Sequence, residues 1–315
     1  MAGAAATAPV VPVLASPFPN RVNPYAAGAQ GQALRWARRL GLIRSAETGA
    51  LAAQRFGRLA GRCHPGLTPG PLAEVCRWYL WFALVDDRYC DGTEDGVDGQ
   101  GRLAARLAGL SQALSTGAAA EGEALAVAAA DLGRRTRARA THEQYRRLLL
   151  GFHATFFGLL WERAARRPAG ATGLGEYLGM RPYTGALPAF VTLTEIFTGR
   201  PPAPEDVARP EVQALVARGG NLIMWQNDIR SYPWEASSGR PVLSLPTVLE
   251  RNVGLPPPVA VAAAAGMWRD EVARYRQARA DVLRLAVPAL RRYADRLHDL
   301  VAGFLTWHYE TARYG

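Results

Sequence analysis

The sequence of 315 residues contains no lysine, so arginine supplies all 37 of its basic side chains. With 27 acidic residues the formal net charge is +10, a balance that would suit a nucleic-acid binder. The arginines are scattered, however, with only short pairs such as Arg38-Arg39 and Arg291-Arg292. Because the sequence shows no clustered basic stripe and no recognised nucleic-acid module, we expect no nucleic-acid partner. A diffuse positive charge favours a small anionic substrate instead.

Cysteine and long apolar runs are also scarce. The three cysteines, at positions 63, 76 and 90, have no metal-type pairing, and their odd number favours a reducing compartment. No apolar run approaches the roughly 18 residues that a membrane span requires. Residues 1–20 lack the positive start and continuous apolar centre of a signal peptide. We therefore predict a soluble, cytoplasmic protein with no membrane span.

Helical periodicity dominates the chain from Gln30 onward, and no alternation of the β type persists. Prolines at positions 17, 19 and 24 keep the start extended, so residues 1–24 are predicted to form a flexible arm. Without a clear linker, residues 25–315 are predicted to form one all-α domain. The expected helices span 30–41, 46–60, 69–90, 99–115, 119–136, 141–166, 173–181, 186–198, 204–235, 244–252, 257–284 and 288–312.

The first candidate site is an acidic cluster at the end of an apolar helix. Residues 78–85 are apolar on every side, and Asp86, Asp87 and Asp91 follow them directly. On an α-helix Asp87 and Asp91 would lie about 40° apart around the axis. Unpaired carboxylates are costly to bury, so such groups pair or bind metal, and their oxygens suit Mg²⁺. A helix end that opens into solvent, with hydrated acids, explains the same pattern.

The second candidate site is a polar stripe on another helix. Asn227, Ser231 and Glu235 are spaced at i, i+4 and i+8, so they share one face, from which Asp228 is offset. Their amide, hydroxyl and carboxylate oxygens would form part of a Mg²⁺ site, although an ordinary polar helix surface has similar composition. Pro233 removes a backbone hydrogen bond within this stripe and predicts a kink.

Together the two motifs resemble the signatures of bacterial class I terpene synthases. That family has an Asp-rich motif after an aromatic helix and, later, the motif N-D-(L/I/V)-x-(S/T)-x-x-x-E. Arg181 lies 46 residues before Asn227, which is the offset of the family's diphosphate-sensing arginine. Thr184 and Gly185 follow at the family's linker and effector positions. In this chain Cys90 stands where the last acid of the Asp-rich motif often lies, with Asp91 one position later.

Both ends of the chain extend this resemblance. The family tends to close with a Trp-containing helix and an Arg-Tyr pair, and this chain closes with Trp307, Arg313 and Tyr314. Residues 18–24 are similar to the family's N-terminal segment. The resemblance implies a single-domain, class I terpenoid synthase-like helical bundle around a central cavity. Chain-elongating prenyltransferases share that fold, but they would require two Asp-rich motifs and several lysines.

The implied activity is that of a Mg²⁺-dependent terpene cyclase, a carbon–oxygen lyase. Such an enzyme ionises a linear prenyl diphosphate, cyclises the carbocation to a hydrocarbon or alcohol, and releases diphosphate. The family favours farnesyl diphosphate as the substrate. Geranylgeranyl diphosphate, geranyl diphosphate and a non-catalytic role in binding a prenyl diphosphate are the alternatives. The sequence leaves open whether the chain forms a homodimer.

The resemblance also implies roles for individual residues. Three Mg²⁺ ions would be held by Asp86, Asp87, Asp91, Asn227, Ser231 and Glu235. The diphosphate would be bound by Arg181, Arg313 and Tyr314, with Thr184 and Gly185 responding to it. Arg230 would replace the basic residue that often precedes the final Glu, where this chain has Trp234. The aromatic residues expected to line a carbocation pocket are Phe82, Tyr89, Phe152, Phe156, Tyr183, Trp225 and Trp307.

Overall fold

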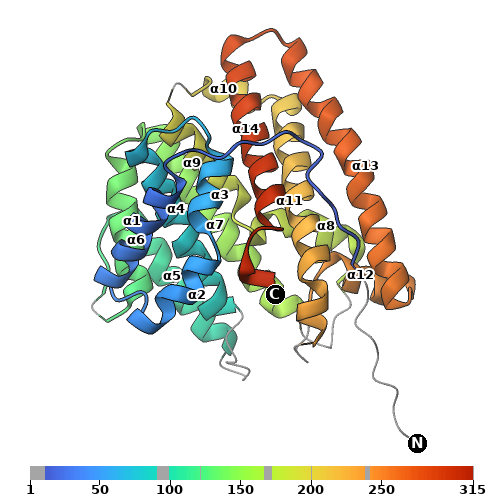
Figure 1. Ribbon diagram of the computed structural model, residues 1–315, viewed down its shortest axis with the longest axis horizontal. Coiled ribbons are helices and arrows are strands. Elements are labelled where there is room, and N and C mark those ends of the chain that lie inside the picture. The colour runs from blue at the N-terminus through green and yellow to red at the C-terminus, as the bar shows by residue number, and fades with distance from the viewer. Residues whose placement is uncertain are drawn as a thin grey trace, which may run out of the picture.

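The computed structural model describes residues 11–90, 99–120, 122–166, 172–199, 201–237 and 242–314, and within these ranges it contains helices and no strand. The all-α fold predicted from the sequence is therefore confirmed (Figure 1). The elements are α1 (Ala26–Arg39), η1 (Ser45–Glu47), α2 (Thr48–Ala53), α3 (Phe56–Cys63), α4 (Pro69–Val85), η2 (Asp86–Cys90), α5 (Gly99–Thr116), α6 (Ala124–Arg137), α7 (His142–Ala165), α8 (Leu174–Thr184), α9 (Leu187–Thr198), α10 (Pro204–Val207), α11 (Pro210–Ser237), α12 (Leu245–Val253), α13 (Pro257–Arg284), α14 (Pro288–Trp307) and η3 (Ala312–Tyr314).

Helix α4 is enclosed by other helices of the bundle. It begins at Pro69, where the missing N–H is no loss, and residues 78–85 are all buried. The indole N–H groups of Trp78 and Trp81 donate to Thr136 Oγ1 and to a backbone carbonyl of α6, so both buried indole donors have acceptors. Because α4 packs against α1, α3, α6 and α9, its last turn is fixed inside the bundle.

Three of the predicted helices are interrupted or change geometry within their expected span. The helix expected over 46–60 is interrupted at Arg55, whose φ of 57° is left-handed, so α3 begins only at Phe56. The helix expected over 69–90 leaves α geometry after Val85 and continues as the π turn η2. The helix expected over 204–235 is split before Pro210, since the residue that precedes a proline disfavours helix. Pro233 lies inside α11 and does not end it.

Residues 11–24, which we call the strap, cross α11 and α14 before the chain enters α1 (Figure 1). Leu14 and Phe18 of the strap are buried, and the Phe18 ring packs against rings of α13 and α14. The Leu14 carbonyl accepts a 2.7 Å hydrogen bond from Gln226 Nε2 of α11. This part of the expected flexible arm is thus packed onto the domain, whereas residues 1–10 lie outside the described residues.

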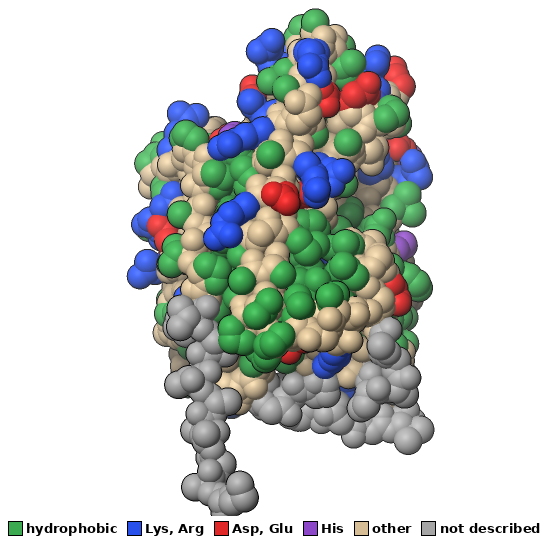
Figure 2. All heavy atoms as spheres, turned by 90° about the vertical axis from the view of Figure 1, so that its right-hand side faces the viewer, with side chains coloured by type: hydrophobic (Ala, Val, Ile, Leu, Met, Phe, Trp, Pro, Cys, Tyr) green, Lys and Arg blue, Asp and Glu red, His purple; other side chains and the backbone are tan. Residues whose placement is uncertain are grey.

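The surface gives no sign of a concentrated basic stripe on the face that Figure 2 presents. On that face, along which α13 runs, arginines are interspersed with acidic and uncharged side chains, and hydrophobic side chains gather below them (Figure 2). No helix within the described ranges combines the length and the apolar character needed to cross a bilayer.

Candidate active site

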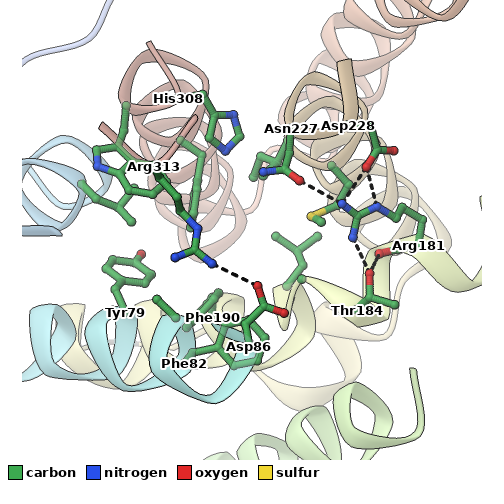
Figure 3. A pocket seen from close by; sticks show the side chains of 18 of the residues that line it. Tyr79, Phe82, Asp86, Arg181, Thr184, Phe190, Asn227, Asp228, His308 and Arg313 are labelled. Carbon is green, nitrogen blue, oxygen red and sulfur yellow. Dashed lines mark hydrogen bonds and ion pairs between the residues drawn. The ribbon is translucent and has the colours of Figure 1, made fainter. Parts of the chain in front are cut away.

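A cavity lies between α4, α8, α9, α11 and α14, with one aromatic side and one polar side (Figure 3). Tyr79, Phe82 and Phe190 form part of its aromatic side. Nine of the residues predicted from the sequence line this cavity: Phe82, Asp86, Arg181, Thr184, Gly185, Asn227, Glu235, Trp307 and Arg313. The bundle therefore brings both polar motifs, which are far apart in the sequence, to one cavity.

Asp86 and Asp87 lie in the π turn that follows α4. Their side chains are 35% and 36% exposed, and Arg313 contacts both. Arg313 donates from Nη1 and Nη2 to the two carboxylate oxygens of Asp87, at 3.1 and 2.5 Å, and from Nη2 to Asp86 Oδ2 at 3.2 Å. Asp86 and Asp87 thus lie in π geometry, which turns less per residue than the α geometry expected for them. Asp91 lies outside the described residues.

Arg313 is held in place by the anchoring of the C-terminal segment. The backbone carbonyl of Gln54 accepts 2.9 Å hydrogen bonds from Trp307 Nε1 and from Thr311 Oγ1. Glu310 accepts from Arg58 Nη2 at 2.8 Å and from Arg62 Nε at 2.7 Å. These contacts fix residues 307–313, which we call the tail, to α2 and α3. Of Tyr314 the structure establishes only its place in η3.

The second motif occupies the C-terminal part of α11. Asn227 Oδ1 accepts a 2.9 Å hydrogen bond from Arg181 Nη2, and Ser231 is buried. Burial raises the pKa of Glu235 to about 7, although a hydrogen bond from Ser231 acts in the opposite direction. A divalent cation beside Glu235 would favour its carboxylate form, because metal ligands bind deprotonated.

Asp228 explains how Arg181 is positioned, and the sequence had given it no defined role. Only 2% of Asp228 is exposed, and its Oδ1 accepts from Arg181 Nε at 2.9 Å and Nη2 at 2.7 Å. Its Oδ2 accepts from the Tyr177 hydroxyl and from the Leu245 N–H. Arg181 also donates to Thr184 Oγ1, so its guanidinium is held by α8 and α11 together (Figure 3). A buried arginine requires such a partner, which is the signal that could have pointed to Asp228.

The aromatic side of the cavity differs in part from the prediction. Phe82 and Trp307 line the cavity, and they are joined by four aromatic residues that the sequence did not single out: Phe56, Tyr79, Phe190 and Phe304. Phe82 meets Phe190 edge to face, with ring centroids 5.6 Å apart. These rings present π faces and apolar edges to the cavity, an environment that suits a cation while excluding water.

The other five predicted aromatic residues lie elsewhere and are not among the described residues that line the cavity. Phe152 is fully buried and stacks on Trp78 at 5.1 Å, and Phe156 packs behind it. The Tyr89 hydroxyl donates to Glu123 Oε1 at 2.9 Å. Tyr183 is 38% exposed, whereas Trp225 is buried in the core.

Besides Asp228, two further charged residues at the cavity were not predicted, and one that was predicted lies apart from it. Glu162 and Arg166, from the end of α7, line the cavity. The Arg230 guanidinium instead lies over the ring of Tyr309, 5.7 Å from its centroid, and Arg230 does not line the cavity in the part of the chain described.

The donor set of the two motifs fits Mg²⁺ by its chemistry. Asp86, Asp87, Asn227, Ser231 and Glu235 offer only oxygen atoms, which hard divalent cations prefer. Within the described ranges no three His, Cys, Asp or Glu side chains gather into one cluster. Asp86 and Asn227, one from each half of the donor set, lie on opposite sides of the cavity (Figure 3). A phosphate-bearing ligand between the two halves would complete the coordination.

The helical fold and the two facing motifs are those of a class I terpene synthase. The family described as terpene synthase family 2, C-terminal metal binding, matches residues 77–274, and the chain belongs to this family. It is a terpene cyclase, an enzyme of the lyase class that acts on a prenyl diphosphate, and its family is a metal-binding one.

Named relatives and solved structures are similar over nearly the whole chain. The (+)-T-muurolol synthase of Streptomyces clavuligerus is 31% identical over 95% of this chain and 72% of its own length. The (12E)-labda-8(17),12,14-triene synthase of Streptomyces cyslabdanicus is 29% identical over 95% of this chain and 90% of its own. The structure of 2-methylisoborneol synthase from Streptomyces coelicolor A3(2), in complex with Mg²⁺ and 2-fluoroneryl diphosphate, shares the fold, with a TM-score of 0.84, 24% identity and coverage of 99% of this chain and 98% of that one.

Proposed function

We propose that the chain is a sesquiterpene cyclase that ionises farnesyl diphosphate with three Mg²⁺ ions and closes the carbocation to a hydrocarbon or alcohol. The observation that carries this proposal is the meeting of both polar motifs at one cavity with an aromatic side. The name of the (+)-T-muurolol synthase relative describes it as farnesyl diphosphate cyclizing, which supports the same substrate here.

The polar residues would divide the work of holding the diphosphate. Asp86 and Asp87, supported by Asp91, would hold Mg²⁺ on one side, and Asn227, Ser231 and Glu235 would hold it on the other. Bound Mg²⁺ would neutralise the diphosphate and stabilise it as a leaving group. A homodimer and a cytoplasmic location stay predictions of the sequence.

The arginines would bind the diphosphate directly. Arg181 and Arg313 lie on opposite sides of the cavity, and each now donates to carboxylates of the motif beside it. A guanidinium can donate two parallel hydrogen bonds to phosphate oxygens as readily as to a carboxylate. We expect both arginines, with Tyr314, to turn N–H and O–H donors toward the diphosphate. Thr184, which Arg181 contacts, and Gly185 next to it would respond to that movement.

The aromatic side would guide the carbocation after the diphosphate leaves. Phe82, Phe190 and Trp307 could place ring faces beside the positive charge, and the buried wall would keep water away until the product forms. Substitutions in this wall are expected to change the ratio of products more than the rate of diphosphate release.

Product analysis tests the proposal directly. The chain is incubated with Mg²⁺ and, separately, with geranyl, farnesyl and geranylgeranyl diphosphate, and extracts are examined by gas chromatography–mass spectrometry. We expect C15 products from farnesyl diphosphate, and no product when a chelator removes Mg²⁺. Asn227→Ala and Glu235→Ala should abolish product. Absence of turnover with all three substrates would refute cyclase activity.

A diterpene synthase is the second candidate. The relatedness to a labdatriene synthase favours it, because that chain is about as similar to this one as the muurolol synthase is. Preferred turnover of geranylgeranyl diphosphate in the same experiment would select this alternative and exclude the sesquiterpene proposal.

A further inference from the structure

The motif position just before Glu235, where the family often has a basic residue, holds Trp234, which is 55% exposed. If a cationic side chain contacts the diphosphate beside Glu235, a residue other than Trp234 must supply it. Arg230 is near in sequence, but its guanidinium lies over the Tyr309 ring and away from the described cavity wall. Arg166 belongs to a different helix, yet it lines the cavity together with Glu235.

Arg166 is held at the end of α7 with its charged group near the site. It is the C-cap residue of that helix, where a positive charge is favoured by the helix dipole. Its Nη2 donates to Glu162 Oε1 at 2.6 Å, one turn earlier on the same helix. The Arg166 side chain is 27% exposed, so a ligand in the cavity can reach it without unfolding any helix.

The cavity lining agrees with this placement. Arg166, Arg181 and Glu235 all line the same cavity, so both arginines share the space beside the second motif. Arg181 approaches from α8 and Arg166 from α7, so their charges reach this end of the cavity from different helices.

We propose that Arg166 is a third arginine that binds the diphosphate of the substrate, beside Arg181 and Arg313. The proposal rests on the proposed function, because it takes the ligand to be a prenyl diphosphate. Glu162 keeps the guanidinium extended toward the cavity before the ligand arrives. When the diphosphate is bound, the Arg166 guanidinium donates to its oxygens.

Binding of inorganic diphosphate in the presence of Mg²⁺ tests the role of Arg166. Isothermal titration calorimetry on the full chain should show about tenfold weaker binding for Arg166→Gln, as expected for loss of a hydrogen bond between charged groups. Arg166→Lys should recover part of the affinity, because it restores the charge without the fork. An Arg166→Gln affinity within about twofold of wild type would overturn the proposal.

Two further variants provide the controls. Arg146 lies on the same helix and pairs with Glu143 at 2.8 Å, but it is exposed and lies outside the described cavity wall. Arg146→Gln should bind diphosphate within about twofold of wild type. Arg230→Gln tests the competing assignment from the sequence. A tenfold loss in Arg230→Gln with no loss in Arg166→Gln would assign the charge to Arg230 instead.

Turnover separates this inference from the proposed function. With farnesyl diphosphate, Arg166→Gln should raise KM while the ratio of products and the melting temperature stay unchanged. A purely structural role would lower the melting temperature and leave diphosphate affinity intact. If the wild type binds Mg²⁺ and diphosphate but makes no terpene, cyclisation is refuted while the affinity series still decides the role of Arg166. If the wild type binds no diphosphate, the inference falls as well.

Discussion

The two halves of the polar site are built differently, although one directly follows a core helix, α4, and the other lies in the C-terminal part of another, α11. Asp86 and Asp87 remain about one-third exposed, and they are bridged by an arginine of the tail. In the other half, Asp228 is almost fully buried and joins α8, α11 and the start of α12 through Arg181, Tyr177 and Leu245. The second half is therefore part of the core, whereas the first depends on a terminal segment docked against it.

This difference predicts how each half responds to change. A buried ion pair that loses one partner leaves an uncompensated charge, which destabilises the fold strongly. A pair with exposed members contributes little to stability, because water solvates either partner alone. Stability should therefore report on the half around Asp228, and activity without a stability change should report on the half around Asp86.

The largest effect is expected for Asp228→Asn. The amide keeps the shape of the carboxylate but cannot balance the charge of Arg181, so the free energy of unfolding should fall by about 3 kcal/mol. Urea denaturation measures this loss. The matched control is Asp206→Asn, which breaks a more exposed pair with Arg209 and should cost less than about 1 kcal/mol. Equal losses in the two variants would contradict the idea that the second half belongs to the core.

In contrast to Asp228→Asn, Asp86→Asn should lower activity and leave stability almost unchanged. Asp86 lines the cavity, so losing its charge should lower kcat about a hundredfold by weakening the hold on Mg²⁺. The free energy of unfolding should change by less than about 1 kcal/mol. Diphosphate release and urea denaturation measure the two quantities. A large loss of stability with kcat retained would show that Asp86 is a structural residue.

The docking of the tail should depend on pH through Glu310. Burial raises the pKa of Glu310, but hydrogen bonds from Arg62 and Arg58 outweigh it and lower the value to about 2. Because the folded pKa lies below the unfolded one, this contribution is complete above about pH 4.5 and is lost as the pH falls toward 2.

Glu310→Gln tests this dependence. The variant should be less stable at pH 7 by about 1–2 kcal/mol, after allowance for partial exposure, and its stability should change less than that of wild type between pH 4.5 and 3. Urea denaturation at the two ends of that range measures it. Parallel loss in both proteins would show that other carboxyl groups control the acid response.

The sequence predicted the helices well where periodicity and end signals agree. Thr141 and Gln144 form a capping box at the start of α7, close to the predicted boundary. The break at Arg55 was missed because a left-handed backbone at arginine has no local sequence signal. The π turn at Asp86 was missed for a similar reason, since the sequence around it continues a helical pattern.

Within the site, the sequence predicted correctly which residues of one helix share a face. It did not predict arrangements that depend on the packing of several helices. Asn227 and Ser231 share a face because α-helical spacing alone requires it. Phe82 and Phe152 look alike in sequence, yet only Phe82 lines the cavity, because the packing of neighbouring helices decides depth. Arg230 was predicted for its nearness to Glu235 in sequence, whereas the place of Arg166 in the cavity wall depends on how α7 packs in the bundle, which no local pattern predicts.

The smallest effect concerns the contact between the two helices that carry Arg181 and Asn227. A Cβ on Gly185 would clash with Met224 Sδ, although the backbone of Gly185 is in an ordinary conformation. Met224 is flexible and lines the cavity, so in Gly185→Ala it should turn aside into the space meant for substrate. We expect a loss of about 1 kcal/mol in the free energy of unfolding and an altered ratio of products.

A double-mutant cycle isolates this contact. Met224→Ala alone should cost about 2 kcal/mol by leaving a cavity, and adding Gly185→Ala to it should cost almost nothing further, because the clash has been removed. Urea denaturation of the four proteins gives the coupling energy, which we expect to be about 1 kcal/mol. Additive losses would mean that Gly185 is needed for backbone movement and not for its close approach to Met224. Any response to diphosphate would then pass through the backbone of residues 181–185 and not through the Met224 side chain.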